Sequence, residues 1–187
     1  MAFAIFGGTF DPIHSAHLAV ARHAAEKFGL DYVLLIPNGN PPHKPGARRT
    51  PFEHRYRMAE LATEGDARLK VSRMEEGEAR SYSILTIEKL KAAHPGERIL
   101  FLIGADAFSE IETWHRWRDV VRAVEFIVVS RPGHRYDVPE DARVHRLDDL
   151  DLPVSSSRIR EELRRGGEPP ELSAGVVRYI RENNLYR

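Results

Sequence analysis

The chain has 187 residues, of which 42% are apolar, enough to close one hydrophobic core. Its 28 basic and 28 acidic residues balance, so no net field draws the protein to nucleic acid or to an anionic membrane, and any phosphate binding must be local. Cysteine is absent, which excludes disulfides, thiolate nucleophiles and thiolate metal sites and makes the cytoplasm the simplest expected compartment.

The amino-terminal residues predict a strand, a helix and a second strand. Residues 2–6 are a short apolar run, and residues 14–28 place apolar side chains at helical spacing. Residues 32–36 are almost wholly apolar, which is typical of a strand buried on both faces of a parallel sheet. We therefore expect a βαβ unit here, and neither a signal peptide nor a membrane span.

A proline-rich and glycine-rich segment, residues 38–49, follows the second predicted strand and reads as a working loop. After it, Thr50, Pro51 and Glu53 match the N-cap, first-turn proline and third-position acid of a capping box, which predicts a helix over about 51–62. Residues 69–71 are a weaker strand candidate.

The remaining residues repeat the alternation. Helices are predicted over 83–93, 118–124, 155–165 and 173–184, and strands over 99–103, 126–130 and 144–147. This order predicts an α/β fold, a doubly wound, Rossmann-like parallel sheet with a C-terminal helical appendage over about 155–187, all in a single domain over 1–187. The ligand site of such a sheet lies at the carboxyl ends of the strands.

Directly after the first predicted strand comes GGTFDPIHSAH, residues 7–17. Gly7 and Gly8 allow a sharp turn close to an anion, and the helix start that follows offers unpaired amides and a positive dipole end. The motif has neither the GxGxxG spacing nor the GK[ST] end of a P-loop. His14 and His17 are three residues apart, so both imidazoles can face one side and donate to phosphate. A capping or surface role stays open for each histidine, and a zinc site lacks a convincing third ligand.

A second candidate phosphate site lies at the N-terminus of the helix predicted from residue 155. Ser155, Ser156 and Ser157 supply an N-cap and spare hydroxyl groups, and Arg158 and Arg160 bring positive charge. A basic charge at a helix N-terminus opposes the dipole unless an anion lies between them, which favours a triphosphate there. Ordinary capping is the alternative interpretation.

Single residues after other strands are further candidates. Gly104 and Asp106 follow a buried strand and can meet a ribose hydroxyl. Arg131 ends another strand, where it can reach a phosphate or pair with a surface acid. Trp114 and Trp117 are spaced for one helical face, and core packing is the ordinary role of such tryptophans.

GGTFDPIHSAH resembles the GGTFDPxHxGH signature of a nucleotidyltransferase superfamily that is distantly similar to class I aminoacyl-tRNA synthetases. Within it, the bacterial nicotinate-nucleotide adenylyltransferases are the best match. Further matching motifs run in order along nearly the whole chain: PPHK (41–44), SYS (81–83), GADAF and WHRW (104–117), SRPG (130–133), VSSSRIR (154–160) and VVRYIRENNLY. The chain departs from the family pattern at Ala16, where the family has glycine, and at Val154 and Ser157, where it has isoleucine and threonine.

The resemblance implies adenylyl transfer from ATP to nicotinate mononucleotide, giving deamido-NAD and pyrophosphate, with Mg²⁺ carried mainly by the ATP phosphates. It implies four catalytic residues: His14, His17, Lys44 and Arg160. The implied ATP-binding residues are Gly7, Gly8, Thr9, Phe10, Gly104, Asp106, Arg131, Ser156 and Ser157. For the acceptor, it implies a phosphate clamp at Lys44, a stack on Trp114 and backbone amides near Ser83 for the ring carboxylate.

Alternatives to this function remain. The acceptor can instead be nicotinamide mononucleotide or phosphopantetheine, or the chain can be a catalytically silent nucleotide-binding module, since fold does not set function. Nucleic acid and membrane are not expected as partners, and a homo-oligomer stays open.

Overall fold

The structure is a computed structural model that describes residues 1–40, 49–131 and 133–187. Its described residues form six strands in one parallel sheet. The strands are β1 (Ala2–Gly8), β2 (Tyr32–Pro37), β3 (Leu69–Val71), β4 (Arg98–Gly104), β5 (Glu125–Val129) and β6 (Arg143–Leu147), in the order β3-β2-β1-β4-β5-β6. This is the doubly wound order, and it reverses between β1 and β4, where Phe3 pairs with Tyr32 on one side and Ile99 on the other.

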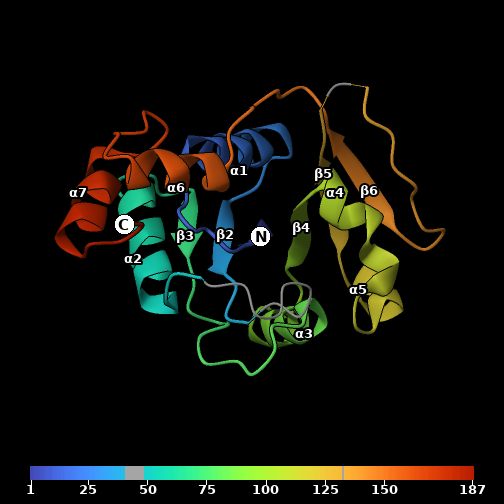
Figure 1. The fold of residues 1–187 in the computed structure, drawn as a ribbon. Coiled ribbons are helices and arrows are strands. Elements are labelled where there is room, and N and C mark those ends of the chain that lie inside the picture. The colour runs from blue at the N-terminus through green and yellow to red at the C-terminus, as the bar shows by residue number, and fades with distance from the viewer. Residues whose placement is uncertain (41–48, 132) are drawn as a thin grey trace.

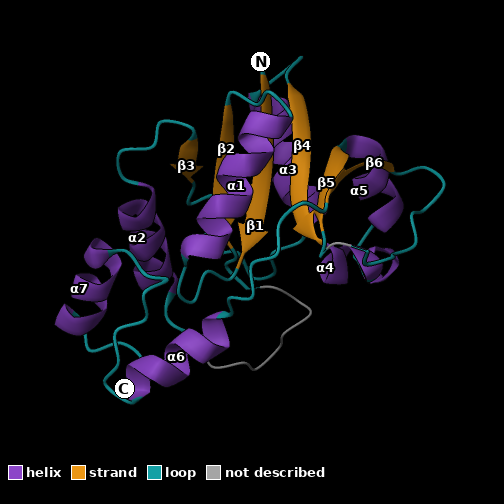
Figure 2. Cartoon of the chain, turned by 90° about the horizontal axis from the view of Figure 1, so that it is seen from above, coloured by secondary structure: helices purple, strands orange, loops and turns teal. Residues whose placement is uncertain are grey.

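Helices cover both faces of the sheet, as Figures 1 and 2 show. One face carries α1 (Ser15–Lys27), α2 (Phe52–Thr63), α6 (Ser156–Arg164) and α7 (Ala174–Glu182). The other carries α3 (Ser83–Ala93), α4 (Ala105–Ser109), the 3₁₀ helix η1 (Ile111–Thr113) and α5 (Trp117–Ala123). In Figure 2, α4 and α6 lie beyond the arrowheads of the strands, on either side of the carboxyl edge of the sheet.

Alternate residues of each central strand enter different cores, because successive side chains of a strand point to opposite faces. Ala4 packs with α1 and α2, whereas Phe3 and Ile5 pack with α3 and α5. The same core that holds α1 also holds Ile159 of α6 and Ile180 of α7, so the C-terminal helices are continuous with it. These contacts confirm the predicted α/β class and its buried parallel strands.

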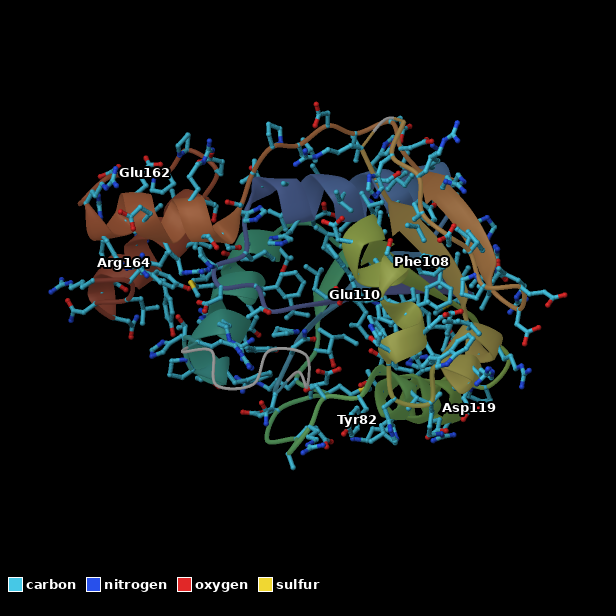
Figure 3. The ribbon with its side chains drawn as sticks, turned by 45° about the vertical axis from the view of Figure 1, so that its right-hand side comes forward. Tyr82, Phe108, Glu110, Asp119, Glu162 and Arg164 are labelled. Atoms are coloured by element: carbon cyan, nitrogen blue, oxygen red, sulfur yellow. The ribbon has the colours of Figure 1, made fainter. Side chains whose placement is uncertain are left out.

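The outer helical surfaces carry charge. Figure 3 shows Asp119 of α5 and Arg164 of α6 among the side chains on these surfaces, and both are exposed. In the described ranges, no helix is long and apolar enough to cross a membrane.

Two local predictions are wrong, although most element ends agree within one or two residues. Thr50 does not cap α2, because the helix begins at Phe52 and its N-cap is Pro51, which has no side-chain hydrogen bond to offer. The Thr50 amide donates to the Asp11 carboxylate at 3.1 Å. Trp114 and Trp117 do not share a helix, because Arg116 adopts a left-handed conformation between them, with φ of 53°.

Candidate active site

Two adjoining cavities lie at the carboxyl edge of the sheet, where the strand order reverses. The larger has a volume of about 890 Å³, within the range of roughly 300–1,000 Å³ typical of small-molecule sites. The smaller has a volume of about 180 Å³. Phe6, Gly104 and Ala107 line both, so the two spaces meet at the ends of β1 and β4. This is the place that the predicted fold assigns to a ligand.

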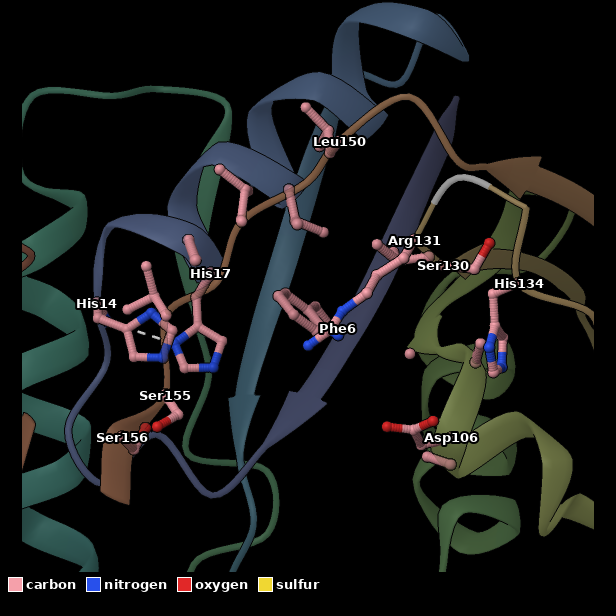
Figure 4. A pocket seen from close by; sticks show the side chains of 18 residues that line it. Phe6, His14, His17, Asp106, Ser130, Arg131, His134, Leu150, Ser155 and Ser156 are labelled. Atoms are coloured by element: carbon pink, nitrogen blue, oxygen red, sulfur yellow. Dashed lines mark hydrogen bonds between the residues drawn. The ribbon is translucent and has the colours of Figure 1, made fainter. Parts of the chain in front are cut away.

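His14 and His17 form part of one wall of the larger cavity, opposite Asp106 and His134 in Figure 4. The two rings face the same side, as the three-residue spacing predicts, and they stack with centroids 3.7 Å apart. The His14 amide donates to Nδ1 of His17 at 3.3 Å, so the neutral His17 ring carries its proton on Nε2.

Both imidazoles are neutral at pH 7. Burial lowers the pKa of His14 to about 4, although the negative charge of Glu171 opposes the shift. Burial and the neighbouring His14 lower the pKa of His17 to about 3. Each ring therefore offers one N–H donor to a phosphate, and an anion in the cavity would favour the protonated form.

The turn of GGTFDPIHSAH, residues 7–17, called the signature segment below, is not made by its glycines. This corrects the prediction from sequence. Gly7 and Gly8 continue β1, and the positive φ, 48°, belongs to Phe10. A Cβ on Gly8 would lie 2.8 Å from the Phe10 ring, so the glycine makes room for that ring. Phe10 is buried, and its ring packs edge to face against the His17 ring with centroids 5.1 Å apart. This contact limits how the His17 ring can turn.

A buried arginine holds this segment in place. Arg55 of α2 is 2% exposed, and its guanidinium donates to the carbonyls of Thr9, Asn38 and Thr50, each at 2.8 Å. Thr9 belongs to the signature segment, Asn38 is the first residue of the proline-rich segment, and Thr50 directly follows that segment. One side chain therefore ties three loop positions together.

Four of the nine predicted ATP-binding residues line the larger cavity, namely Gly104, Asp106, Arg131 and Ser156. The other five do not: Gly7 lines the smaller cavity, and Gly8, Thr9, Phe10 and Ser157 line neither. Gly104 and Asp106 contribute from the end of β4 and the start of α4, and Arg131 from beyond β5. Gly104 has an ordinary φ of −72° and nothing within 4 Å of a built Cβ, so the protein itself does not require glycine there. Ala16, which replaces the family's glycine, is also in the wall.

The N-terminus of α6 is only partly in the larger cavity. Ser155 and Ser156 line it; Ser155 caps the helix by accepting from the Arg158 amide, as predicted, and Ser156 donates to the Pro12 carbonyl at 3.1 Å. Ser157 and Arg160 do not line it. Arg160 donates to the Asp11 carbonyl at 2.7 Å and to Ser157 Oγ at 3.2 Å. It therefore contacts the signature segment without lining the larger cavity.

The smaller cavity contains both described residues predicted for the acceptor. Ser83 contributes from the first turn of α3, and Trp114 follows η1 and packs against Phe101 with ring centroids 6.0 Å apart. Glu75 and Asn38 complete its polar lining with Thr86. Lys44, predicted as catalytic and acceptor-binding, lies outside the described residues.

Sequence reasoning missed several side chains. Phe6 lines both cavities, and its only signal is its place at the end of the first apolar run. Asp11 is 7% exposed and accepts from Tyr186 Oη at 2.5 Å, a contact between the two ends of the chain that no local pattern predicts. Arg55 reads as one more surface charge on a helix, and Glu75 as part of an acidic loop.

Comparisons with known proteins agree with this geometry. The cytidylyltransferase-like family matches residues 5–162. A probable nicotinate-nucleotide adenylyltransferase of Solibacter usitatus is 58% identical over 187 residues, the whole of both chains. One from Bacillus pumilus is 38% identical, covering 97% of this chain and 96% of the other.

A solved structure has the same fold. Nicotinic acid mononucleotide adenylyltransferase of Plasmodium falciparum, complexed with NaAD, superposes with a TM-score of 0.80 at 21% identity, covering 99% of this chain and 97% of that one. Identity of 58% along the full length, with the matching fold, places the chain among its relatives: it belongs to the nicotinate-nucleotide adenylyltransferase family of nucleotidyltransferases.

Proposed function

We propose that this enzyme transfers the adenylyl group of ATP to nicotinate mononucleotide, giving deamido-NAD and pyrophosphate. The observation that carries the proposal is the pair of cavities that meet at Phe6 and Gly104. One has stacked imidazoles beside two helix starts, and the other has a tryptophan in an aromatic wall. A reaction that joins two nucleotides needs two such spaces with a common border.

The larger cavity suits ATP. The starts of α1 and α6 supply amides and positive dipole ends, and His14 and His17 add neutral donors, a combination that favours a polyphosphate. Asp106 and the open space at Gly104 suit the ribose, and Arg131 adds a positive charge.

The smaller cavity suits the base of the acceptor nucleotide. Its volume of about 180 Å³ is close to the roughly 150 Å³ that accommodates a benzene ring in an engineered protein cavity. Trp114 offers a face for stacking, and the amides at the start of α3 near Ser83 offer donors to a ring carboxylate.

The chemistry needs no covalent enzyme intermediate. A phosphate oxygen of the acceptor attacks the α-phosphorus of ATP, a new P–O bond forms, and the bond to the bridging oxygen breaks so that pyrophosphate leaves. The acceptor is already an anionic nucleophile, so alignment and charge stabilisation suffice. His14 and His17 donate to the phosphate oxygens as negative charge moves to the leaving group.

A divalent cation is expected with ATP, and Mg²⁺ is the one we propose. In the described ranges no group of three or more His, Asp or Glu side chains is arranged to hold a metal ion, so the donor set fits an ion bound mainly by phosphate oxygens and water. When bound, such an ion neutralises charge on the departing pyrophosphate.

The lack of cysteine in the sequence supports a reducing compartment, the cytoplasm.

The test is a pyrophosphate-release assay with ATP and Mg²⁺, run in parallel with nicotinate mononucleotide, its amide and phosphopantetheine. We expect the highest kcat/KM with nicotinate mononucleotide. Equal or better turnover with either of the other acceptors would reassign the substrate, and no turnover with all three would favour a silent nucleotide-binding module.

A further inference from the structure

Glu75 is a buried carboxylate in the segment between β3 and α3. It is 6% exposed, and Oε1 accepts a hydrogen bond from Thr86 Oγ1 at 2.9 Å. Oε2 is also buried but has no hydrogen-bond partner among the described residues. A buried carboxylate oxygen without a hydrogen-bond partner is costly, so the site favours a ligand that supplies the missing partner.

The backbone holds Glu75 in this position. A Cβ on Gly39 would lie 2.0 Å from the Glu75 carbonyl oxygen, so the two backbones can approach only because residue 39 is glycine. Nearby, the Asn40 amide donates to Ser81 Oγ at 2.9 Å. Residues 38–40 and the segment before α3 are therefore packed against one another, which sets the position of the Glu75 backbone.

Glu75 lines the smaller cavity together with the aromatic pair Phe101 and Trp114. Aromatic faces attract cations through their quadrupole, and a carboxylate in the same enclosed space attracts them through its charge. The volume admits one six-membered ring. A flat, cationic ring therefore matches this lining better than a neutral one.

We propose that Glu75 is the counter-ion of the pyridinium ring of the acceptor and makes the cavity selective for a cationic base. The inference rests on the proposed function, in which a pyridine nucleotide is the acceptor. The ring nitrogen of such a nucleotide carries a positive charge because it also forms the glycosidic bond. The carboxyl group of nicotinate must then lie away from Glu75, since like charges repel.

The substitution Glu75→Gln tests this directly, because it removes the charge but preserves the side-chain volume and an oxygen for the Thr86 hydroxyl. Two acceptors are compared by calorimetry: nicotinate mononucleotide and a neutral analogue, meaning a carbon-linked nucleotide in which an uncharged phenyl ring replaces the pyridinium. Both acceptors carry the same ionised 3-carboxylate, so they differ only in the charge of the ring. We expect E75Q to weaken binding of nicotinate mononucleotide by about tenfold or more and to change binding of the neutral analogue by less than about twofold.

A matched control is Glu78→Gln, in the same segment, where the carboxylate pairs with Lys89 at the surface. It should leave binding of both acceptors unchanged. Should E75Q not fold, Glu75→Asp keeps the charge and is expected to retain the preference for the cationic ring. Equal losses for the two acceptors, or no loss for either, would overturn the role of Glu75 as counter-ion.

The same proteins separate this inference from the proposed function. Turnover of nicotinate mononucleotide by the wild-type enzyme tests the function, whereas the charge-dependent binding difference tests Glu75. Binding without turnover would refute the function and leave the Glu75 comparison decisive. If the wild type binds neither acceptor, the counter-ion role is refuted as well.

Discussion

The His17 ring is held more firmly than its place on an exposed helix start suggests. It stacks on His14, meets the edge of Phe10, and accepts the His14 amide on Nδ1. These contacts direct its Nε2 proton away from the backbone, and burial keeps the ring neutral by lowering its pKa. Such a donor is oriented before the ligand arrives, which is how oxyanion stabilisation becomes effective.

Replacing His17 by alanine should therefore lower kcat far more than it weakens ATP binding. Loss of one oriented donor typically costs about 100-fold to 1,000-fold in kcat. Steady-state kinetics and calorimetric ATP affinity measure the two effects. His23→Ala is the control, because His23 lies on the same helix and pairs with Asp149 outside both cavities. Equal losses in kcat and ATP affinity for H17A would contradict a role in the transition state.

The two lowered histidine pKa values also predict how stability depends on pH. Unfolded histidine titrates near 6.5, whereas His14 and His17 titrate near 4 and 3 in the fold. Between these values the unfolded chain binds more protons, so stability falls as the pH drops below about 6.5 and levels off below about 3. Above pH 6.5 the pair has no such effect.

Urea unfolding at pH 7 and pH 5 measures this dependence before most carboxylates titrate. We expect each histidine to account for about 1 kcal/mol or more of the loss between these two values. The double variant H14N/H17N should show a shallower loss than the wild type, and H23N should not. If the double variant loses as much stability between pH 7 and pH 5 as the wild type, other groups are responsible for the pH dependence.

Among the helices, α2 has a structural role that its length does not reveal. Through Arg55 it joins the signature segment at Thr9 to Asn38, the first residue of the proline-rich segment, and to Thr50, which directly follows that segment. The guanidinium is suited to this because its five donors are held in a rigid fork. Thr9, Asn38 and Thr50 are thus positioned by one helix.

Arg55→Met should destabilise the fold strongly, because three carbonyls lose a charged donor at once. The expected loss is about 3 kcal/mol or more in the free energy of unfolding. Arg55→Lys keeps the charge but cannot reach all three carbonyls, so we expect a smaller loss of stability with a lower kcat/KM. Arg57→Ala, on the same helix in a surface pair with Glu60, should change stability by less than about 1 kcal/mol. A similar loss of stability in R55M and R57A would contradict the proposed structural role of the three Arg55 hydrogen bonds.

At the scale of the whole molecule, C-terminal residues form hydrogen bonds with the signature segment. Tyr186 Oη donates to Asp11 Oδ1, and the Ser15 amide donates to the Glu171 carbonyl at 2.8 Å. Arg160 adds a third contact at the Asp11 carbonyl. The site is therefore assembled from both ends of the sequence, and it depends on docking of α6 and α7.

Tyr186→Phe tests this dependence. It removes the hydroxyl donor and leaves a buried Asp11 oxygen unpaired, which should cost about 1–3 kcal/mol of stability and also raise the KM for ATP. Tyr179→Phe is the matched control, because it removes a similar bond to His54 that does not touch the signature segment. Thermal unfolding and kinetics should show a loss of stability in both variants and a change in KM only in Y186F.

Much of the fold was predictable from local pattern. Apolar runs such as residues 99–103 and helical spacing such as residues 83–93 report burial directly, so the order of strands and helices follows from the sequence. That order implies a parallel sheet and places the ligand at its carboxyl edge, where the cavities lie. That the two imidazoles face one side also follows from their spacing of three residues at a helix start.

Only the tertiary structure decided which side chains make the site rigid. Gly8 is glycine because the ring of Phe10 occupies the space of its Cβ, and Arg55 is buried because three loop carbonyls need a donor. Asp11 and Tyr186 meet across 175 residues. Hydrophobic periodicity records which face of an element is buried, but a polar contact between distant segments depends on how those elements pack, and no local pattern carries that information.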